Sequence, residues 1–204
     1  MITPETGPAE LPAALYDTDP AALSRLRDGL VGAAGRAGLL DVAYRTLDTP
    51  VGTLLLATTE RGLVRIAFDC QDHDLALVTL AEQVSPRILL APGRLDAAVC
   101  QLSEYFAGTR RVFDLPLDLR LRTGFRRSVL AHLPEIAYGR TESYAQVAVA
   151  TGRPGAARAV GTACAPNPLP VVVPCHRVVR SDGSAGGYAG GYAAKQALLA
   201  LEHG

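Results

Sequence analysis

Hydrophobic residues between positions 42 and 68 gather in three short runs that are separated by turn residues. The runs are Val42–Thr46, Thr53–Thr58 and Leu63–Phe68, and they are joined by Thr49-Pro50-Val51-Gly52 and Glu60-Arg61-Gly62. Short apolar runs divided by Gly- and Pro-containing connections are typical of strands joined by tight turns. The pattern therefore predicts a three-stranded antiparallel meander.

Helical spacing of hydrophobic residues appears on both sides of these strands. The predicted helices are one after Asp19-Pro20 that ends at Gly35 or Gly38, one over Asp74–Gln83, and one from Arg94 to Phe106. Asp before Pro is an N-cap followed by the proline position that starts many helices. Residues 1–18 are rich in Pro, Glu and small residues and predict a loose tail. We therefore expect an N-terminal extension with one helix over 1–40 and an α/β domain over 41–118.

The remainder of the chain is mostly helical in pattern after an extended link over Asp114–Arg122. The predicted helices run from Thr123-Gly124 to about Ile136, over Tyr144–Ala150, over Gly155–Cys164 and over Ala193–Glu202. Two short helices joined by a Gly-containing turn are compatible with a helix-turn-helix, and also with an ordinary pair of antiparallel helices. The fold class predicted is α+β, with a C-terminal domain over 119–204.

Charge is divided unevenly along a chain of 204 residues and zero formal net charge. Residues 1–119 contain 10 basic and 16 acidic residues, whereas residues 120–204 contain 10 basic and 4 acidic residues. A basic half can bind phosphate while the whole chain stays neutral. The asymmetry is also common between domains, so it favours nucleic acid only modestly.

Targeting and membrane signals are absent from the pattern. No stretch reaches the roughly 18 uncharged apolar residues that a membrane span needs, and the N-terminus has no basic and apolar signal segment. The four cysteines are too widely spaced for a disulfide framework. We expect a cytoplasmic protein without a membrane partner, in a reducing compartment that keeps its thiols free.

The densest chemistry lies in Pro174-Cys175-His176-Arg177, which follows an apolar run and precedes a glycine-rich loop. A cysteine becomes a nucleophile as its thiolate, and a neighbouring base or positive charge favours that form. The residues alone leave a buried cysteine beside an incidental histidine as an alternative.

This region resembles the O6-alkylguanine-DNA alkyltransferases, the methylated-DNA–protein-cysteine methyltransferases. The matching residues are Asn167-Pro-Leu-Pro-Val-Val-Val-Pro-Cys-His-Arg-Val-Val, the loop Gly187-Tyr-Ala-Gly-Gly, and the upstream block Ala157-Arg158-Ala159-Val160-Gly161 with Ser143-Tyr144. The resemblance covers about residues 41–204. It implies a ribonuclease H-like N-terminal half and a winged-helix-like C-terminal half with a helix-turn-helix. It also implies a DNA repair protein that flips O6-alkylguanine out of duplex DNA and keeps the alkyl group irreversibly.

The resemblance assigns catalytic roles to five residues. Cys175 is the implied alkyl acceptor, His176 its base through a water, and Glu202 the group that orients His176. Glu202 lies in the last turn of a predicted helix, where the macrodipole disfavours a carboxylate, so a compensating partner is expected. Tyr144 is the implied donor to N3 of the guanine. Asn167 is expected to brace the turn before an active-site strand, because Asx side chains bond nearby backbone groups.

The resemblance also implies a DNA-binding set and a pocket for the flipped base. The DNA-binding residues are Arg158, as a finger entering the duplex, with Ala157, Tyr144 and Gly161; the pocket residues are Val178, Tyr188, Ala189 and Gly190. Ala189 stands where some relatives have Ser, and Ala165-Pro166 where many have a basic residue and a Gly or Asn. These two departures concern base contacts and DNA affinity more than the chemistry.

No cofactor and no metal are expected. Cys70, His73 and Cys100 are a weak metal set, since structural zinc sites need four well-spaced ligands. We expect a monomer whose partner is double-stranded DNA that contains O6-alkylguanine, and cooperative binding along DNA is left open. The alternatives are a lesion-binding module without transfer, a cysteine hydrolase and a helix-turn-helix regulator. The presence of Cys175 argues against a lesion-binding module, and the lack of an evident oxyanion hole argues against a hydrolase. A regulator would leave the Pro-Cys-His-Arg motif unexplained.

Overall fold

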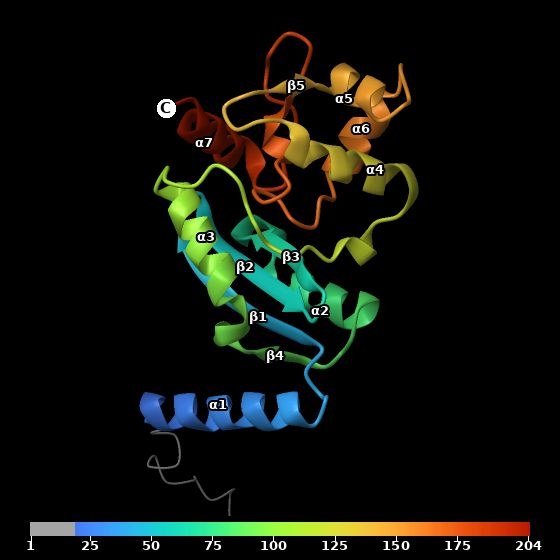
Figure 1. The fold of residues 1–204 in the computed structure, drawn as a ribbon. Helices are drawn as coiled ribbons and strands as arrows, with labels where there is room; N and C mark the ends of the chain where they lie inside the picture. The colour runs from blue at the N-terminus through green and yellow to red at the C-terminus, as the bar shows by residue number, and fades with distance from the viewer. Residues whose placement is uncertain (1–18) are drawn as a thin grey trace, which may run out of the picture.

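The computed structural model describes residues 19–204, and its two halves are stacked end to end (Figure 1). A small sheet with helices forms the first half, and a mostly helical bundle forms the second half, so the predicted α+β class is confirmed. The loose tail predicted over residues 1–18 lies outside the described residues.

The predicted meander is present as β1 (Val42–Thr49), β2 (Gly52–Thr59) and β3 (Gly62–Phe68), paired antiparallel in sequence order. A fourth strand that the sequence did not predict, β4 (Ile88–Leu90), pairs in parallel with β1. The sheet order is therefore β3-β2-β1-β4, and the sheet is mixed. The three residues of β4 lie between Pro86 and Pro92, and so short a run has no alternation of polar and hydrophobic residues that would indicate a strand. Their hydrogen-bonding partner is β1.

Two helices cover opposite faces of this sheet. The helix α2 (His73–Gln83) packs through Ala76 on one face, and α3 (Asp96–Phe106) packs through Leu102 and Tyr105 on the other. Strand β2 is therefore buried on both faces, which explains its uninterrupted run Leu54–Ala57.

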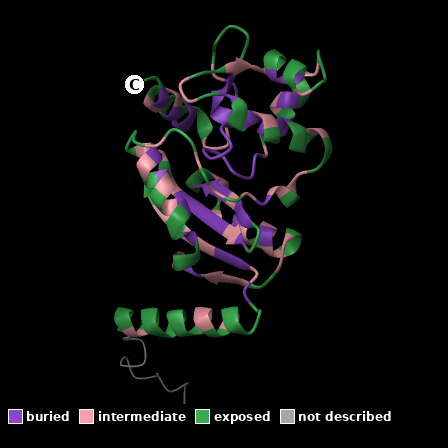
Figure 2. Ribbon diagram, viewed as in Figure 1, coloured by how far each residue is buried: buried purple, intermediate pink, exposed green. Residues whose placement is uncertain are grey.

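The helix of the N-terminal extension, α1 (Pro20–Arg36), begins at Asp19, whose side chain accepts from the Ala21 amide at 3.0 Å. Val31 and Ala34 pack against Leu40 and its neighbours near β4, but no residue of α1 is buried, and its surface is almost wholly exposed (Figure 2). The first predicted helix is confirmed, and it adds little to the core.

The C-terminal half consists of α4 (Gly124–His132), α5 (Tyr144–Ala150), α6 (Ala157–Cys164) and α7 (Gly191–His203). A two-stranded parallel pair, β5 (Glu142–Ser143) with β6 (Val178–Val179), also lies there and was not predicted. Ser143 caps α5 in a reciprocal capping box with Gln146.

Four helix boundaries differ from the prediction by two residues or more. Helix α3 begins at Asp96 rather than Arg94, because Pro92–Leu95 form a 3₁₀ turn. Helix α4 ends at His132 rather than near Ile136, because Pro134 lies in a following 3₁₀ turn. Helix α6 begins at Ala157 rather than Gly155, since Gly155 has φ +88° and so belongs to the turn. Helix α7 begins two residues before Ala193.

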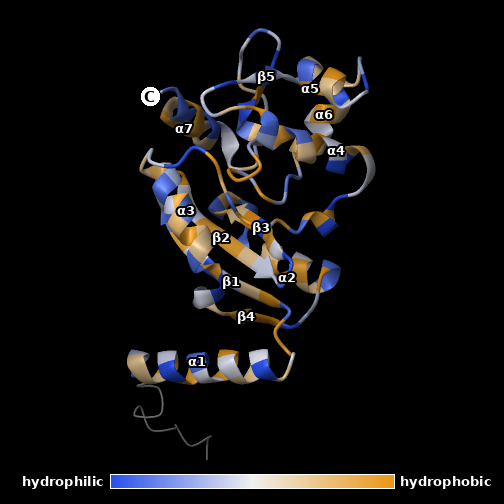
Figure 3. Ribbon diagram, viewed as in Figure 1, coloured by the Kyte–Doolittle hydropathy of each residue, from blue (hydrophilic) through white to orange (hydrophobic). Residues whose placement is uncertain are grey.

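One hydrophobic core crosses the boundary between the halves. Hydrophobic segments are present in both halves (Figure 3). It contains Leu54 and Leu102 from the first half with Val129, Val160 and Leu198 from the second. The linking segment also runs along β3, where the Leu63 amide donates to the Pro116 carbonyl at 2.8 Å. The two halves therefore fix each other's position.

Candidate active site

The segment that carries Cys175 is a chain of turns and not the strand that was predicted. Val171 has φ +73°, a left-handed conformation that is costly for a β-branched residue. Pro174, at φ −82° and ψ 63°, forms an inverse γ-turn in which the Cys175 amide donates to the Val173 carbonyl at 2.8 Å. Cys175 then begins a 3₁₀ turn over Cys175–Arg177. In this turn Cys175 lies against Asn167, whereas the next two side chains, His176 and Arg177, both reach Glu202.

Asn167 braces this turn as predicted, although no strand follows it. Its Oδ1 accepts from the Leu169 amide at 3.0 Å, and its Nδ2 donates to the Val173 carbonyl at 2.8 Å. The same Nδ2 donates to Sγ of Cys175 at 3.1 Å. Asn167 is buried, so one amide side chain both shapes the turn and contacts the sulfur.

The thiol of Cys175 lies beneath the surface, with 4% of the residue exposed. Burial raises its pKa to about 11, while the hydrogen bond from Asn167 and the charge of Lys195 act in the opposite direction. Burial penalises the thiolate because a charge loses its hydration. The resting thiol is therefore protonated at neutral pH, and its use as a nucleophile needs a base.

The next residue, His176, carries a basic ring nitrogen. Its side chain is fully buried, and its Nε2 lies 2.9 Å from Oε1 of Glu202. A carboxylate only accepts, so Nε2 carries the proton and Nδ1 is the basic nitrogen. Nδ1 is buried without a hydrogen-bond partner among residues 19–204. Burial lowers the pKa of His176, which keeps the ring neutral and able to accept a proton.

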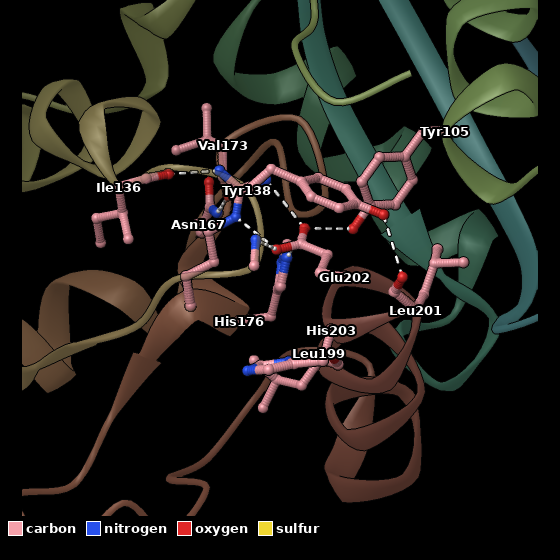
Figure 4. Close-up of polar contacts among 12 residues, drawn as sticks. Tyr105, Ile136, Tyr138, Asn167, Val173, His176, Leu199, Leu201, Glu202 and His203 are labelled. Carbon is pink, nitrogen blue, oxygen red and sulfur yellow. Dashed lines mark hydrogen bonds and ion pairs between the residues drawn. The ribbon is translucent and has the colours of Figure 1, made fainter. Parts of the chain in front are cut away.

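Glu202 is the centre of a larger network (Figure 4). Arg177 donates to both of its oxygens at 2.9 Å, the Tyr105 hydroxyl donates to Oε1 at 2.7 Å, and the Gly139 amide donates to Oε2 at 3.3 Å. Although burial opposes ionisation, the hydrogen bonds from His176 and Arg177 lower the pKa of Glu202 to about 2. The carboxylate expected to need a partner in the last turn of its helix therefore has four.

Lys195 is the only lysine of the chain and is fully buried. Its Nζ donates to the Val178 carbonyl at 2.6 Å, and no carboxylate lies within 4.0 Å of it among the described residues. Burial lowers its pKa, and the nearby Cys175 and Cys164 act in the opposite direction. The charge of Lys195 lowers the pKa of Cys175 and so favours its thiolate.

A cleft of about 380 Å³ opens between α5, the start of α6 and the loop after β6. Its lining includes four of the predicted residues, and the full set is Tyr144, Ala145, Ala157, Arg158, Gly161, Arg180, Ser181, Gly186 and Gly187. Arg158 is exposed in the first turn of α6, and the ring of Tyr144 lies against Gly161 and Gly186. Burial raises the pKa of Tyr144, so its hydroxyl stays a donor.

The four predicted base-pocket residues lie outside the lining of this cleft. The Val178 carbonyl accepts from Lys195, and the Tyr188 ring packs edge-on against His176, with centroids 6.2 Å apart. The Ala189 carbonyl lies 3.4 Å from the thiol of Cys70, and a Cβ on Gly190 would lie 2.7 Å from the ring of Phe68. The loop 188–190 is thus held against the N-terminal half.

Three residues of the network were not singled out from the sequence. Arg177 belongs to the motif that was recognised, and its neighbour His176 was the available signal. Lys195 is distinguished as the only lysine of the chain. Tyr105 lies 97 residues from Glu202 and carries no local signal at all.

Residues 19–204 were searched for metal-binding clusters and for membrane-spanning helices. Within residues 19–204, no group of three or more His, Cys, Asp or Glu side chains is placed to hold a metal ion. No helix in that part of the chain is long and apolar enough to cross a membrane.

Two family models match the chain almost end to end beyond its first 41 residues. Residues 42–119 match the ribonuclease-like domain and residues 124–204 the DNA binding domain of 6-O-methylguanine DNA methyltransferase. The chain belongs to this family. Its function is therefore DNA repair by transfer of an alkyl group to a protein cysteine.

Individual members of the family are similar over most of their length. The methylated-DNA–protein-cysteine methyltransferase of Mycolicibacterium paratuberculosis is 43% identical, over 79% of this chain and 92% of that protein. The crystal structure of Mycobacterium tuberculosis O6-methylguanine methyltransferase superposes with a TM-score of 0.70 at 42% identity, covering 79% and 93% of the two chains. The structure of that protein in complex with DNA gives 0.68 at the same identity, over 79% and 92%.

Proposed function

We propose that Cys175 is the alkyl acceptor of this methyltransferase and that it acts once. The observation that carries the proposal is a buried thiol directly followed in the chain by a buried histidine whose basic nitrogen has no hydrogen-bond partner among residues 19–204. In the step, sulfur forms a bond to the alkyl carbon, the bond between that carbon and O6 breaks, and its electron pair stays on the base. The product thioether has no easy hydrolysis, so one protein repairs one lesion.

The proton that leaves Cys175 is taken up by His176. The thiol proton passes to Nδ1 of His176 through a bridging water, since adjacent residues in a 3₁₀ turn need not touch directly. Glu202 stabilises the imidazolium that results, because its carboxylate is ionised and 2.9 Å from Nε2. Tyr144 donates to N3 of the leaving guanine, which offsets the negative charge on the base. These parts correspond to nucleophile, base and orienting group.

DNA binds, in this proposal, across the cleft at the start of α6. Arg158 enters the duplex in place of the flipped nucleotide, because an exposed, planar and always-charged guanidinium can stack on bases and bond their edges. Ala157 and Gly161 allow the helix to approach closely, and Tyr144 lies between the helix and the thiol. Flipping is required because an alkyl group inside a stacked duplex is beyond the reach of a buried sulfur.

The base pocket lies below the cleft. The carbonyls of Cys175 and Val178 accept from the guanine amino group, while Tyr188 and the amides of Ala189 and Gly190 approach its other edge. We place the protein as a monomer in a reducing cytoplasm, a compartment that suits four free cysteines. The substrate is double-stranded DNA that contains O6-alkylguanine.

The test is to mix the protein with a duplex that carries one O6-methylguanine and to digest it for mass spectrometry. One methyl group on the Cys175 peptide is expected, with repair stopping at one lesion per protein. Cys164→Ser is the matched control, because Cys164 is also buried and lies near Cys175 in the same core. Cys175→Ser should bind DNA and take up no methyl.

Three results would contradict the proposal. A methyl group on Cys164 would reassign the acceptor. Lesion binding with an unmodified Cys175 would indicate a recognition module, and repeated turnover with a free thiol would indicate another kind of enzyme. For the finger, Arg158→Ala should slow repair of duplex DNA far more than reaction with free O6-benzylguanine, and an equal loss on both would refute that role.

A further inference from the structure

The N-terminal half contributes a side chain to the network that prepares the nucleophile. Tyr105 lies at the end of α3, in the half that carries the sheet, and it is fully buried. Its hydroxyl donates to Oε1 of Glu202 at 2.7 Å, across the boundary between the halves (Figure 4). The catalytic network is therefore not confined to the C-terminal half.

The ring of Tyr105 is held by aromatic packing that does not need its hydroxyl. Phe106, Phe113 and Tyr138 surround it, with ring centroids 5.4, 5.3 and 6.1 Å away. A phenylalanine would keep these contacts. Among residues 19–204 the hydroxyl has one hydrogen-bond partner, Glu202, and burial raises its pKa so that it remains a donor at all working pH values.

The oxygen that Tyr105 contacts is the one that faces the catalytic histidine. Oε1 accepts from His176, from Arg177 and from Tyr105, at 2.9, 2.9 and 2.7 Å. A carboxylate oxygen has about two lone pairs, so three donors share its charge. Tyr105 therefore both fixes the place of Oε1 and withdraws part of its charge from His176.

We propose that Tyr105 is a positioning residue for alkyl transfer, through which the N-terminal half sets the orientation and basicity of His176. The inference rests on the proposed roles of Cys175 and His176. It gives the sheet-bearing half a part in the chemistry, because the hydroxyl aligns Oε1 and thereby keeps Nδ1 of His176 directed at the proton that must leave Cys175.

The test is Tyr105→Phe in the full chain, with single-turnover kinetics on free O6-benzylguanine. The rate constant at saturating substrate should fall by about 3- to 10-fold, less than the full effect of a hydrogen bond to a charged group, because the hydroxyl acts on the reaction only through Glu202 and His176. The substrate concentration at half-maximal rate should stay unchanged. The acidic limb of the pH–rate profile should move to higher pH, because Oε1 then gives more of its charge to His176. In the unreacted protein, the downfield NMR resonance of the His176 Nε2 proton should shift.

Tyr138→Phe is the matched control. Tyr138 packs edge-on against Tyr105, and its hydroxyl donates to the Leu201 carbonyl at 3.1 Å, at the same end of α7, rather than to the carboxylate of Glu202. It should lose a similar amount of thermal stability and keep the wild-type pH profile and resonance.

Two outcomes would overturn the inference. One is a Tyr105→Phe protein with wild-type rate, pH profile and His176 resonance. The other is a Tyr138→Phe protein whose rate, pH profile and His176 resonance change as they do in Tyr105→Phe, which would indicate that both tyrosines act only through packing. The NMR shift tests the role of Tyr105 in protein that has transferred no alkyl group. Methylation of Cys175 in the wild-type protein tests the proposed function and needs no Tyr105 variant. Failure of the positioning role is thus distinguishable from failure of the proposed function.

Discussion

Asn167→Ala should have two effects that can be measured separately, a loss of stability from the turn and a slower reaction at the sulfur. The substitution leaves the buried Leu169 amide without its acceptor and removes one of the two donors to the Val173 carbonyl, which keeps the Cys175 amide. An orphaned buried donor costs about 1–3 kcal/mol and a lost neutral hydrogen bond about 1 kcal/mol. The free energy of unfolding should therefore fall by about 2–4 kcal/mol.

The chemical effect of Asn167→Ala has a separate origin. Nδ2 donates to Sγ at 3.1 Å, and a hydrogen bond to a charged group contributes about 1.5–3 kcal/mol. If the sulfur becomes a thiolate in the transition state, the rate constant for alkyl transfer should fall by about 10- to 150-fold. The pKa of Cys175 should rise further, because the Asn167 hydrogen bond now lowers it.

The assay combines urea unfolding, single-turnover transfer from O6-benzylguanine, and the pH dependence of iodoacetamide labelling at Cys175. Thr59→Val is the matched control, since the buried Thr59 hydroxyl donates to Asp118 at 2.8 Å in the N-terminal half. It should destabilise by a similar amount and leave the rate unchanged. The reasoning is refuted if Asn167→Ala transfers at the wild-type rate per folded molecule, or if Thr59→Val slows transfer equally.

Two further predictions concern the loop and the pH dependence of stability. Gly190→Ala should slow transfer to free O6-benzylguanine at least 10-fold, because its Cβ would lie 2.7 Å from the Phe68 ring; Gly187→Ala, with open space around it, should react normally, and stopped-flow rates that do not differ would contradict this. The free energy of unfolding should fall as the pH drops below about 4.5 toward 2, by up to about 3 kcal/mol, since the folded pKa of Glu202 is about 2 and the folded state binds fewer protons than the unfolded one. It should also fall above pH 9 toward 11, because the folded pKa of Cys175 is raised to about 11 and the folded state there holds the extra proton. Urea midpoints across pH would show a smaller alkaline fall in Cys175→Ala, with a remainder from Cys164, whose pKa burial raises to about 12; an unchanged profile would count against the assignment.

Features that depend on a few neighbouring residues were determined by the sequence. The three strands of the meander, the Asp19 N-cap and the helix over Tyr144–Ala150 all appear where the pattern predicts. Each forms from groups that lie within a turn or two of one another, so local chemistry is sufficient. The motif around Cys175 identifies the family for the same reason, since its chemistry is contiguous in the chain.

Features that depend on distant partners were decided only by the tertiary structure. Strand β4 exists because β1, more than 40 residues earlier in the chain, lies beside it. Tyr105 meets Glu202 across 97 residues, and the burial that raises the pKa of Cys175 comes from a core built by both halves. A sequence lists the groups that can pair, but burial and long-range contact decide which of them do, because both arise only when the chain has closed on itself.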